Sequence, residues 1–244
     1  MINILSSNAS APSKGLLKTP RVQDEDNISW LGRVMSEDDR STIVLVGGKS
    51  PAAFRLRVAQ SHVRHDLYPS SWSHAMLLGK RAKKLASSEV YEISLEAPGG
   101  MGFPPPTNAV QKGKLSAYAD AAQYPNIAVL HVPVETKEVL SALGRFQMQR
   151  AVLDAMDLLV RWLAFSWGVA GTGNPLLENH GIPSAAMLDV VFGAAGFDLT
   201  PGLESRASCP EAIWQAAKWW HEYYEKQGLT SLSGAYVVGH ELLK

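Results

Sequence analysis

The sequence has one cysteine, no excess of either charge and no long uninterrupted apolar run. The single thiol, Cys209, excludes an intrachain disulfide and a zinc site made of several cysteines. Lys and Arg total 23, as do Asp and Glu, so the formal net charge is zero. Such a balance lacks the overall positive charge with which a general nucleic-acid binder neutralises phosphates. We therefore expect no nucleic-acid partner, and we expect neither a metal nor a cofactor.

The sequence also lacks the patterns of a membrane span and of a secretory signal. Its longest apolar candidate, residues 151–171, holds Asp154, Asp157 and Arg161, and charges at the centre of a bilayer are costly. Residues 1–27 are polar and have no apolar stretch of the secretory type. We therefore expect synthesis in the cytoplasm without a signal peptide and no stable membrane insertion. Export by a secretion machine, to act in a target cell's periplasm, stays open.

The apolar pattern predicts an α+β domain, because strands cluster early in the chain and helices late. Strands are expected over residues 42–46, 73–78, 90–95, 127–132 and 235–238. Helices are expected over residues 135–150, 184–195 and 208–227, and residues 151–167 are expected to continue the first of these or to form a second helix. Residues 1–27 are expected to be a flexible segment and residues 28–244 a single domain. The glycine- and proline-containing loops 97–107 and 168–183 are expected to flank a cleft.

A phosphate-binding loop is excluded, although Gly48, Lys49 and Ser50 resemble the end of one. The phosphate-loop pattern requires a second glycine five residues before Gly48, and Ile43 occupies that position.

His74 and Glu92 are candidates for acid–base chemistry. His74 lies in an apolar strand, where an imidazole needs a hydrogen-bond partner, and Glu92 lies in the next strand. Side chains on one face of adjacent strands lie about 5 Å apart, so the carboxylate is able to orient the imidazole. The alternatives are a core histidine satisfied by other groups and an edge-strand glutamate that faces water.

Two residues at predicted helix starts are candidate nucleophiles. Cys209 precedes Pro210 at a helix N-terminus, where the dipole lowers a thiol pKa. Nothing near it in sequence suggests a base, and a lone cysteine is also a common small buried residue. Ser184 opens an apolar helix that Gly196 ends, and its alternative role is that of an N-cap.

Taken in order, these segments resemble the circularly permuted, papain-like NlpC-type peptidases and amidases. The run 43–46 matches the family's first strand, and Ser73-His74 followed by Leu77-Leu78-Gly79 matches its histidine strand. Val90-Tyr91-Glu92 matches the strand that often carries an acid. Counted back from Ala194-Ala195-Gly196, the family's catalytic cysteine falls on Ser184. The match extends over most of residues 40–215, and the shared order of its short motifs carries it.

The resemblance implies a papain-like fold, with a small antiparallel sheet packed against a bundle of helices. It implies hydrolysis of an amide bond through an acyl-enzyme, with a nucleophile at position 184, His74 as acid and base, and Glu92 as the orienting acid. The family position holds Ser184 where a cysteine is expected. Three explanations are open: a Cys-to-Ser variant, a natural inactive relative, and a serine that acts itself. The first is favoured.

The family also implies a substrate class, because its members commonly cut peptide bonds in bacterial cell-wall peptidoglycan. We therefore expect a peptidoglycan-directed endopeptidase or amidase acting as an antibacterial effector, seen in an inactive form. Its partners would be a stem peptide and an immunity or delivery protein. One alternative is an inactive papain-like binding module. Another is a lipid-directed acyltransferase or phospholipase, whose lipid contacts would come from tryptophans that otherwise pack the core: Trp162, Trp167, Trp214, Trp219 and Trp220.

Overall fold

A single mixed sheet organises the chain in the computed structural model, which describes residues 15–35, 39–95, 107–228 and 232–241. The strands are β1 (Leu16–Lys18), β2 (Arg40–Gly47), β3 (His74–Leu78), β4 (Glu89–Glu92), β5 (Gln111–Lys114), β6 (Asn126–Glu135) and β7 (Ser233–Val238). Their order across the sheet is β1-β7-β6-β2-β3-β4-β5. All neighbours are antiparallel except β1 and β7, which are parallel.

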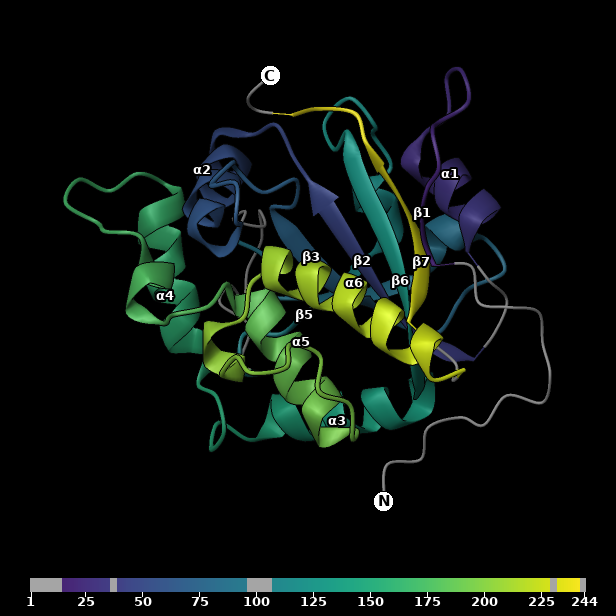
Figure 1. Ribbon diagram of the computed structural model, residues 1–244. Helices are drawn as coiled ribbons and strands as arrows, with labels where there is room; N and C mark the ends of the chain where they lie inside the picture. Colours follow the sequence, from purple (N-terminus) through teal and green to yellow (C-terminus); the bar gives the residue numbers. More distant parts are fainter. Residues whose placement is uncertain (1–14, 36–38, 96–106, 229–231, 242–244) are drawn as a thin grey trace.

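Helices cover both faces of this sheet (Figure 1). They are α1 (Asn27–Val34), α2 (Pro51–Ala59), α3 (Thr136–Met148), α4 (Ala155–Ser166), α5 (Pro183–Ala194) and α6 (Pro210–Lys226). In Figure 1, α3, α5 and α6 lie over one face of the sheet, and α1 lies on its other side. The predicted α+β class is therefore confirmed, and the sheet is larger and less regular than the small antiparallel sheet expected.

Alternation along the central strands divides the core into two layers. Ile43 and Leu45 of β2 pack into a cluster that includes Leu188 of α5, whereas Val44 and Val46 pack into a second cluster with Trp30 of α1. Successive side chains of a strand point to opposite faces, so one strand supplies both layers. Both faces of the central sheet are therefore dry, which explains why its strands read as continuous apolar runs.

The structure decides one open alternative and adds elements that the sequence analysis did not predict. The run 151–167, expected as a continuation of the preceding helix or as a second helix, contains the separate helix α4, because Asp154 accepts a hydrogen bond from Met156 N at 3.0 Å and begins α4 as its N-cap. Within the segment expected to be flexible, β1 pairs with β7 at the edge of the sheet. The expectation also missed α1, α2 and β5, although Ser50 followed by Pro51 is a helix-start signal for α2.

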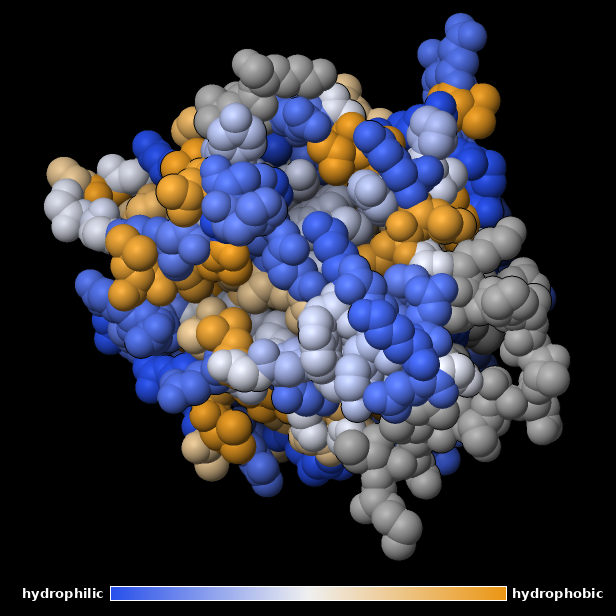
Figure 2. Space-filling model, viewed as in Figure 1, coloured by the Kyte–Doolittle hydropathy of each residue, from blue (hydrophilic) through white to orange (hydrophobic). Residues whose placement is uncertain are grey.

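The tryptophans divide between the core and the surface. Trp162 and Trp214 are 0% and 6% exposed, whereas Trp167 and Trp219 are 62% and 48% exposed. Figure 2 shows that apolar patches on the viewed face are interrupted by hydrophilic side chains, which follow most of α6. Within the described residues, no helix has the length and apolar character needed to cross a bilayer.

Candidate active site

His74 and Glu92 meet on the α1 side of the sheet. The pairing of β3 with β4 places Leu78 opposite Val90, and both pack in the cluster around Trp30. Side chains two residues apart share a face, so His74 on β3 and Glu92 on β4 also point to that side. His74 Nε2 lies 2.6 Å from Glu92 Oε2. The sheet thus brings together the two residues that the sequence predicted to interact.

Glu92 is a buried carboxylate with two donors on one oxygen. Its residue is 6% exposed, which excludes the alternative of an edge glutamate facing water. Tyr118 OH donates a second, short hydrogen bond to the same Oε2 atom. On β5, a Cβ added at Gly113 would lie 3.0 Å from Glu92 Oε1, so the glycine leaves room for the second carboxylate oxygen. The carboxylate of Glu92 is therefore held by His74 on β3 and by Tyr118, and Gly113 on β5 packs against it.

Opposing effects act on the charge of Glu92. Burial raises the pKa of the Glu92 carboxyl, because it disfavours the charged form. The hydrogen bond and charge of His74, together with the hydrogen bond from Tyr118, outweigh burial and lower the pKa below its ordinary value of 4.5. Glu92 is therefore an ionised acceptor at neutral pH.

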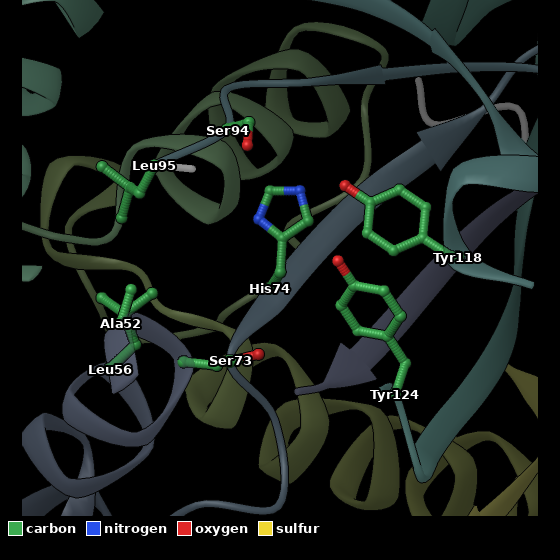
Figure 3. A pocket seen from close by; sticks show the side chains of 9 residues that line it. Ala52, Leu56, Ser73, His74, Ser94, Leu95, Tyr118 and Tyr124 are labelled. Atoms are coloured by element: carbon green, nitrogen blue, oxygen red, sulfur yellow. The ribbon is translucent and has the colours of Figure 1, made fainter. Parts of the chain in front are cut away.

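A pocket opens beside His74. Its lining residues are Ala52, Ala53, Leu56, Ser73, His74, Ser94, Leu95, Tyr118 and Tyr124. Figure 3 shows the imidazole between the two tyrosine rings on one side and Ala52, Leu56 and Leu95 on the other. The ring stacks on Tyr118 with a centroid distance of 6.1 Å and an interplanar angle of 18°. The His74 side chain is 12% exposed, so a small group that enters the pocket is able to reach it.

The N-terminus of α2 forms one wall of this pocket. Ser50 is the N-cap, and its hydroxyl accepts a hydrogen bond from Ala53 N at 3.1 Å. Ala52 and Ala53, in the first turn of the helix, line the pocket. Because the first backbone N–H groups of a helix lack carbonyl partners, this wall carries partial positive charge.

Ser184 does not line this pocket. Pro183 begins α5 with Ile182 as the N-cap, so Ser184 lies inside the helix and not at the predicted cap position. The Ser184 hydroxyl donates to Ala75 O at 2.5 Å and accepts from Ile93 N at 3.3 Å. Residue 184 is fully buried on the α5 face of the sheet, whereas His74 points to the α1 face. The family's nucleophile position is therefore bonded to the backbone next to His74 and lies outside the residues that line the pocket.

Cys209 is also remote from the pocket, and its surroundings do not activate it. It is the N-cap of α6, and Ala212 N donates to its Sγ at 3.4 Å. The residue is 0% exposed, and burial raises the pKa of its thiol to about 12. The helix N-terminus favours the thiolate, but the loss of solvation outweighs that effect.

Sequence reasoning did not identify Tyr118, Tyr124 and the α2 wall. The two tyrosines lie in and after a short 3-10 segment, Leu115–Tyr118, that has no apolar periodicity. Most of the predicted loop 97–107 lies outside the described residues. The predicted loop 168–183 contributes none of the described residues that line the pocket. In the part of the chain that the structure describes, no three His, Cys, Asp or Glu side chains gather as metal ligands.

Comparisons with known proteins do not extend these observations. No protein-family model, curated protein or solved structure matches this chain. The resemblance to the NlpC-type enzymes therefore depends on the order of the short motifs.

Proposed function

We propose that the protein is a hydrolase that cleaves an amide or ester bond from the pocket beside His74. The observation that carries this proposal is the His74–Glu92–Tyr118 arrangement, in which a buried carboxylate lies 2.6 Å from the ring of a pocket-lining histidine. A carboxylate that orients an imidazole is a recurring unit of general acid–base catalysis.

The protonation of His74 follows from its partner. An ionised carboxylate only accepts hydrogen bonds, so the 2.6 Å contact with Glu92 requires a proton on His74 Nε2. A neutral imidazole then carries its lone pair on Nδ1, the nitrogen that Figure 3 shows on the pocket side. His74 is thus prepared to remove a proton within the pocket and to return it to a leaving group. Tyr118 is a positioning residue, because it acts through Glu92.

The α2 wall suits the charge that develops during acyl transfer. A carbonyl under attack acquires negative charge on its oxygen, and N–H groups fixed before the reaction stabilise it. The first turn of α2 lies in the pocket with His74. An acyl group held with its oxygen toward Ala52 would therefore bring its carbonyl carbon near the imidazole.

The substrate class in this proposal comes from the resemblance to NlpC-type enzymes. A stem peptide of bacterial peptidoglycan is the first substrate to examine, with an antibacterial effector as the biological setting. The adjacent histidine and acid strands and the helix α5 on the sheet agree with a permuted papain-like arrangement. The position of Ser184 departs from it, and we therefore exclude that residue from the proposed chemistry.

Hydrolysis tests this function with two histidine variants. The protein is incubated with purified peptidoglycan sacculi and, separately, with p-nitrophenyl acetate. We expect His74→Gln to slow hydrolysis by about 10²–10⁴-fold, the usual contribution of a general acid–base group. His62→Gln is the control, because His62 is an exposed histidine outside the pocket. Equal rates in all three proteins, or an equal loss in both variants, would contradict the proposal.

Expression in the periplasm tests the effector setting. The protein directed to a bacterial periplasm is expected to stop growth, and His74→Gln is expected to restore it. Equal growth with both proteins, in periplasm and cytoplasm alike, would remove the effector setting without affecting the hydrolase proposal.

A second candidate is a binding module that uses the same pocket without turnover. It is favoured by the burial of Ser184 and Cys209 away from His74, because the resemblance implies a nucleophile that neither residue supplies. A muropeptide that binds, shifts the His74 ring signals in NMR spectra and remains uncleaved would support this candidate. Loss of that binding in His74→Gln, but not in His62→Gln, would locate the ligand.

A further inference from the structure

We infer that Ser94 is the nucleophile of the pocket, an inference that rests on the proposed hydrolase function. Ser94 follows β4, and its side chain lines the pocket together with His74. The sequence analysis did not identify it, because an isolated serine after a short strand carries no motif.

The register of the sheet sets Ser94 opposite His74. In the antiparallel pair, Leu78 opposes Val90 and Leu77 opposes Tyr91. Continued by the same count, Ala75 opposes Ile93 and His74 opposes Ser94. Ser94 and Glu92 are two residues apart, so both share a face with His74. By this count, which extends beyond the last bonded pair, the imidazole has the Glu92 carboxylate on one diagonal and the Ser94 hydroxyl across from it.

Ser184 separates the two strands at this point. Gly79 N donates to Glu89 O at 2.8 Å, so every second opposed pair along the strands shares backbone hydrogen bonds. By that alternation, Ala75 and Ile93 would be the next pair after Leu77 and Tyr91 to share backbone hydrogen bonds. The Ser184 hydroxyl instead stands between them, bonded to Ala75 O and Ile93 N. One pair further, between His74 and Ser94, the sheet opens into the pocket.

The view of the pocket agrees with this register. Figure 3 shows the Ser94 hydroxyl turned toward the His74 ring, on the side away from the two tyrosines. Ser94 is half-buried, so its hydroxyl is able to meet an acyl group that enters the pocket.

The other serines near this point and the single thiol have roles that the structure shows. The Ser73 hydroxyl accepts from Gly48 N at 3.0 Å and donates to Val46 O at 3.2 Å. The Ser50 hydroxyl caps α2. Ser184 bridges the strands, and Cys209 is fully buried with a raised thiol pKa. Two serines, Ser73 and Ser94, are among the described residues that line the pocket, and the register sets Ser94 across from His74.

The reaction balances with these residues and water. Ser94 Oγ attacks the substrate carbonyl carbon while His74 Nδ1 takes the hydroxyl proton. The carbon–nitrogen or carbon–oxygen bond then breaks, and His74 returns the proton to the leaving group, which departs. A water molecule, deprotonated by His74, attacks the Ser94 ester. The bond between the acyl carbon and Ser94 Oγ breaks, His74 returns the proton to Ser94 Oγ, and the carboxylic acid product leaves.

A fluorophosphonate probe tests this assignment, because it forms a stable adduct with activated serines. Intact mass and peptide mapping should locate one adduct at Ser94. The adduct should be absent in Ser94→Ala and form at least about 100-fold more slowly in His74→Gln. Ser61→Ala is the matched control, because Ser61 is half-buried like Ser94, its hydroxyl bonds to Val58 O at 2.8 Å, and it is not among the residues that line the pocket. It should label as the unmodified protein does.

A second variant guards against a folding defect in Ser94→Ala. Ser94→Cys should be alkylated by iodoacetamide faster than Cys209, and the additional His74→Gln change should slow that alkylation. An adduct that persists in Ser94→Ala would overturn the assignment and leave the hydrolase function standing. Hydrolysis that depends on His74 without any adduct, or with slow alkylation of Ser94→Cys, would also overturn only the assignment. No adduct together with no hydrolysis would overturn both.

Discussion

At the scale of single residues, Ser184 shows how a tertiary position redefines a residue's role. Its hydroxyl is a bridge between two strands, bonded to Ala75 O and Ile93 N on the α5 face. The same contacts open the sheet beside His74. The residue that the family resemblance marks as a nucleophile position therefore forms hydrogen bonds here to the backbone on both sides of the gap beside His74.

Removal of this bridge should destabilise the fold. Ser184→Ala leaves a buried carbonyl and a buried N–H without their shared partner, which costs about 1–3 kcal/mol of the free energy of unfolding. Urea unfolding measures the loss, with Ser61→Ala as a control at a less buried serine, expected within about 0.5 kcal/mol of the unmodified protein. A Ser184→Ala protein as stable as the control would show that the bridge contributes nothing.

Glu92 should give the stability a specific dependence on acid. Its pKa is lowered in the folded state from the ordinary value of 4.5, so its charge stabilises the fold above that pH. This contribution is lost as the pH falls through the lowered folded pKa. Glu92→Gln lacks the charge, so its free energy of unfolding should fall less than that of the unmodified protein below about pH 4.5. Urea unfolding from pH 6 to about pH 3 measures both curves, and parallel curves would contradict the expectation.

At the scale of elements, α5 is a helix buried on nearly every side. Its apolar face cannot be read from periodicity, because apolar residues lie all around it and nine of its residues, Ser184 and Asp189 among them, are buried. Its ends are instead marked by backbone chemistry, with Pro183 in the first turn and Gly196 after the last. The predicted end at Gly196 is confirmed by its positive φ of 90°.

Two glycines at the end of α5 should respond to alanine in opposite directions. Gly193 is helical, and an added Cβ meets nothing within 4 Å, so Gly193→Ala should stabilise by up to about 1 kcal/mol. Gly196 also has open space, but its φ of 90° is strained for alanine, so Gly196→Ala should destabilise by about 1–2 kcal/mol. Thermal and urea unfolding of the pair measure both effects. The same sign in both variants would contradict the assigned helix end.

At the scale of the whole molecule, one sheet separates two apolar layers. The larger layer holds α3, α5 and α6 against the sheet, and the smaller holds α1 and the tyrosines next to the site. The site therefore lies beside the smaller layer, at an end of β3 where the strands separate. The hydrogen bond from Tyr118 to Glu92 connects β4 to the segment that follows β5 next to the site.

The single thiol should report opening of the larger layer. Cys209 packs in the core of this layer and is 0% exposed to solvent, and burial raises the pKa of its thiol to about 12. Labelling with a thiol reagent should be slow in the folded protein and accelerate with urea in parallel with global unfolding. Rapid labelling without urea would show that the N-terminus of α6 opens locally.

Much of the secondary structure was accessible from the sequence alone. The β-branched runs that became β2 and β6 bury both faces, and such runs differ clearly from their polar surroundings. The helices α3, α4 and α6 follow from their apolar patterns, and α5 follows from its apolar run and from the stop signal at Gly196. Pairing of His74 with Glu92 was also predictable, because adjacent strands and residue alternation place them on one face.

Other features depended on contacts between distant segments, which a local pattern does not encode. Ser184 and Ala75 are 109 residues apart, and only the packing of α5 on β3 directs the hydroxyl to the backbone. Tyr118 reaches Glu92 only because β5 brings the following turn over the edge of β4. The sequence by itself indicated the central strands, the later helices and which histidine has an acid partner. The tertiary structure decided on which side of the sheet each polar group lies, because that depends on how whole elements pack.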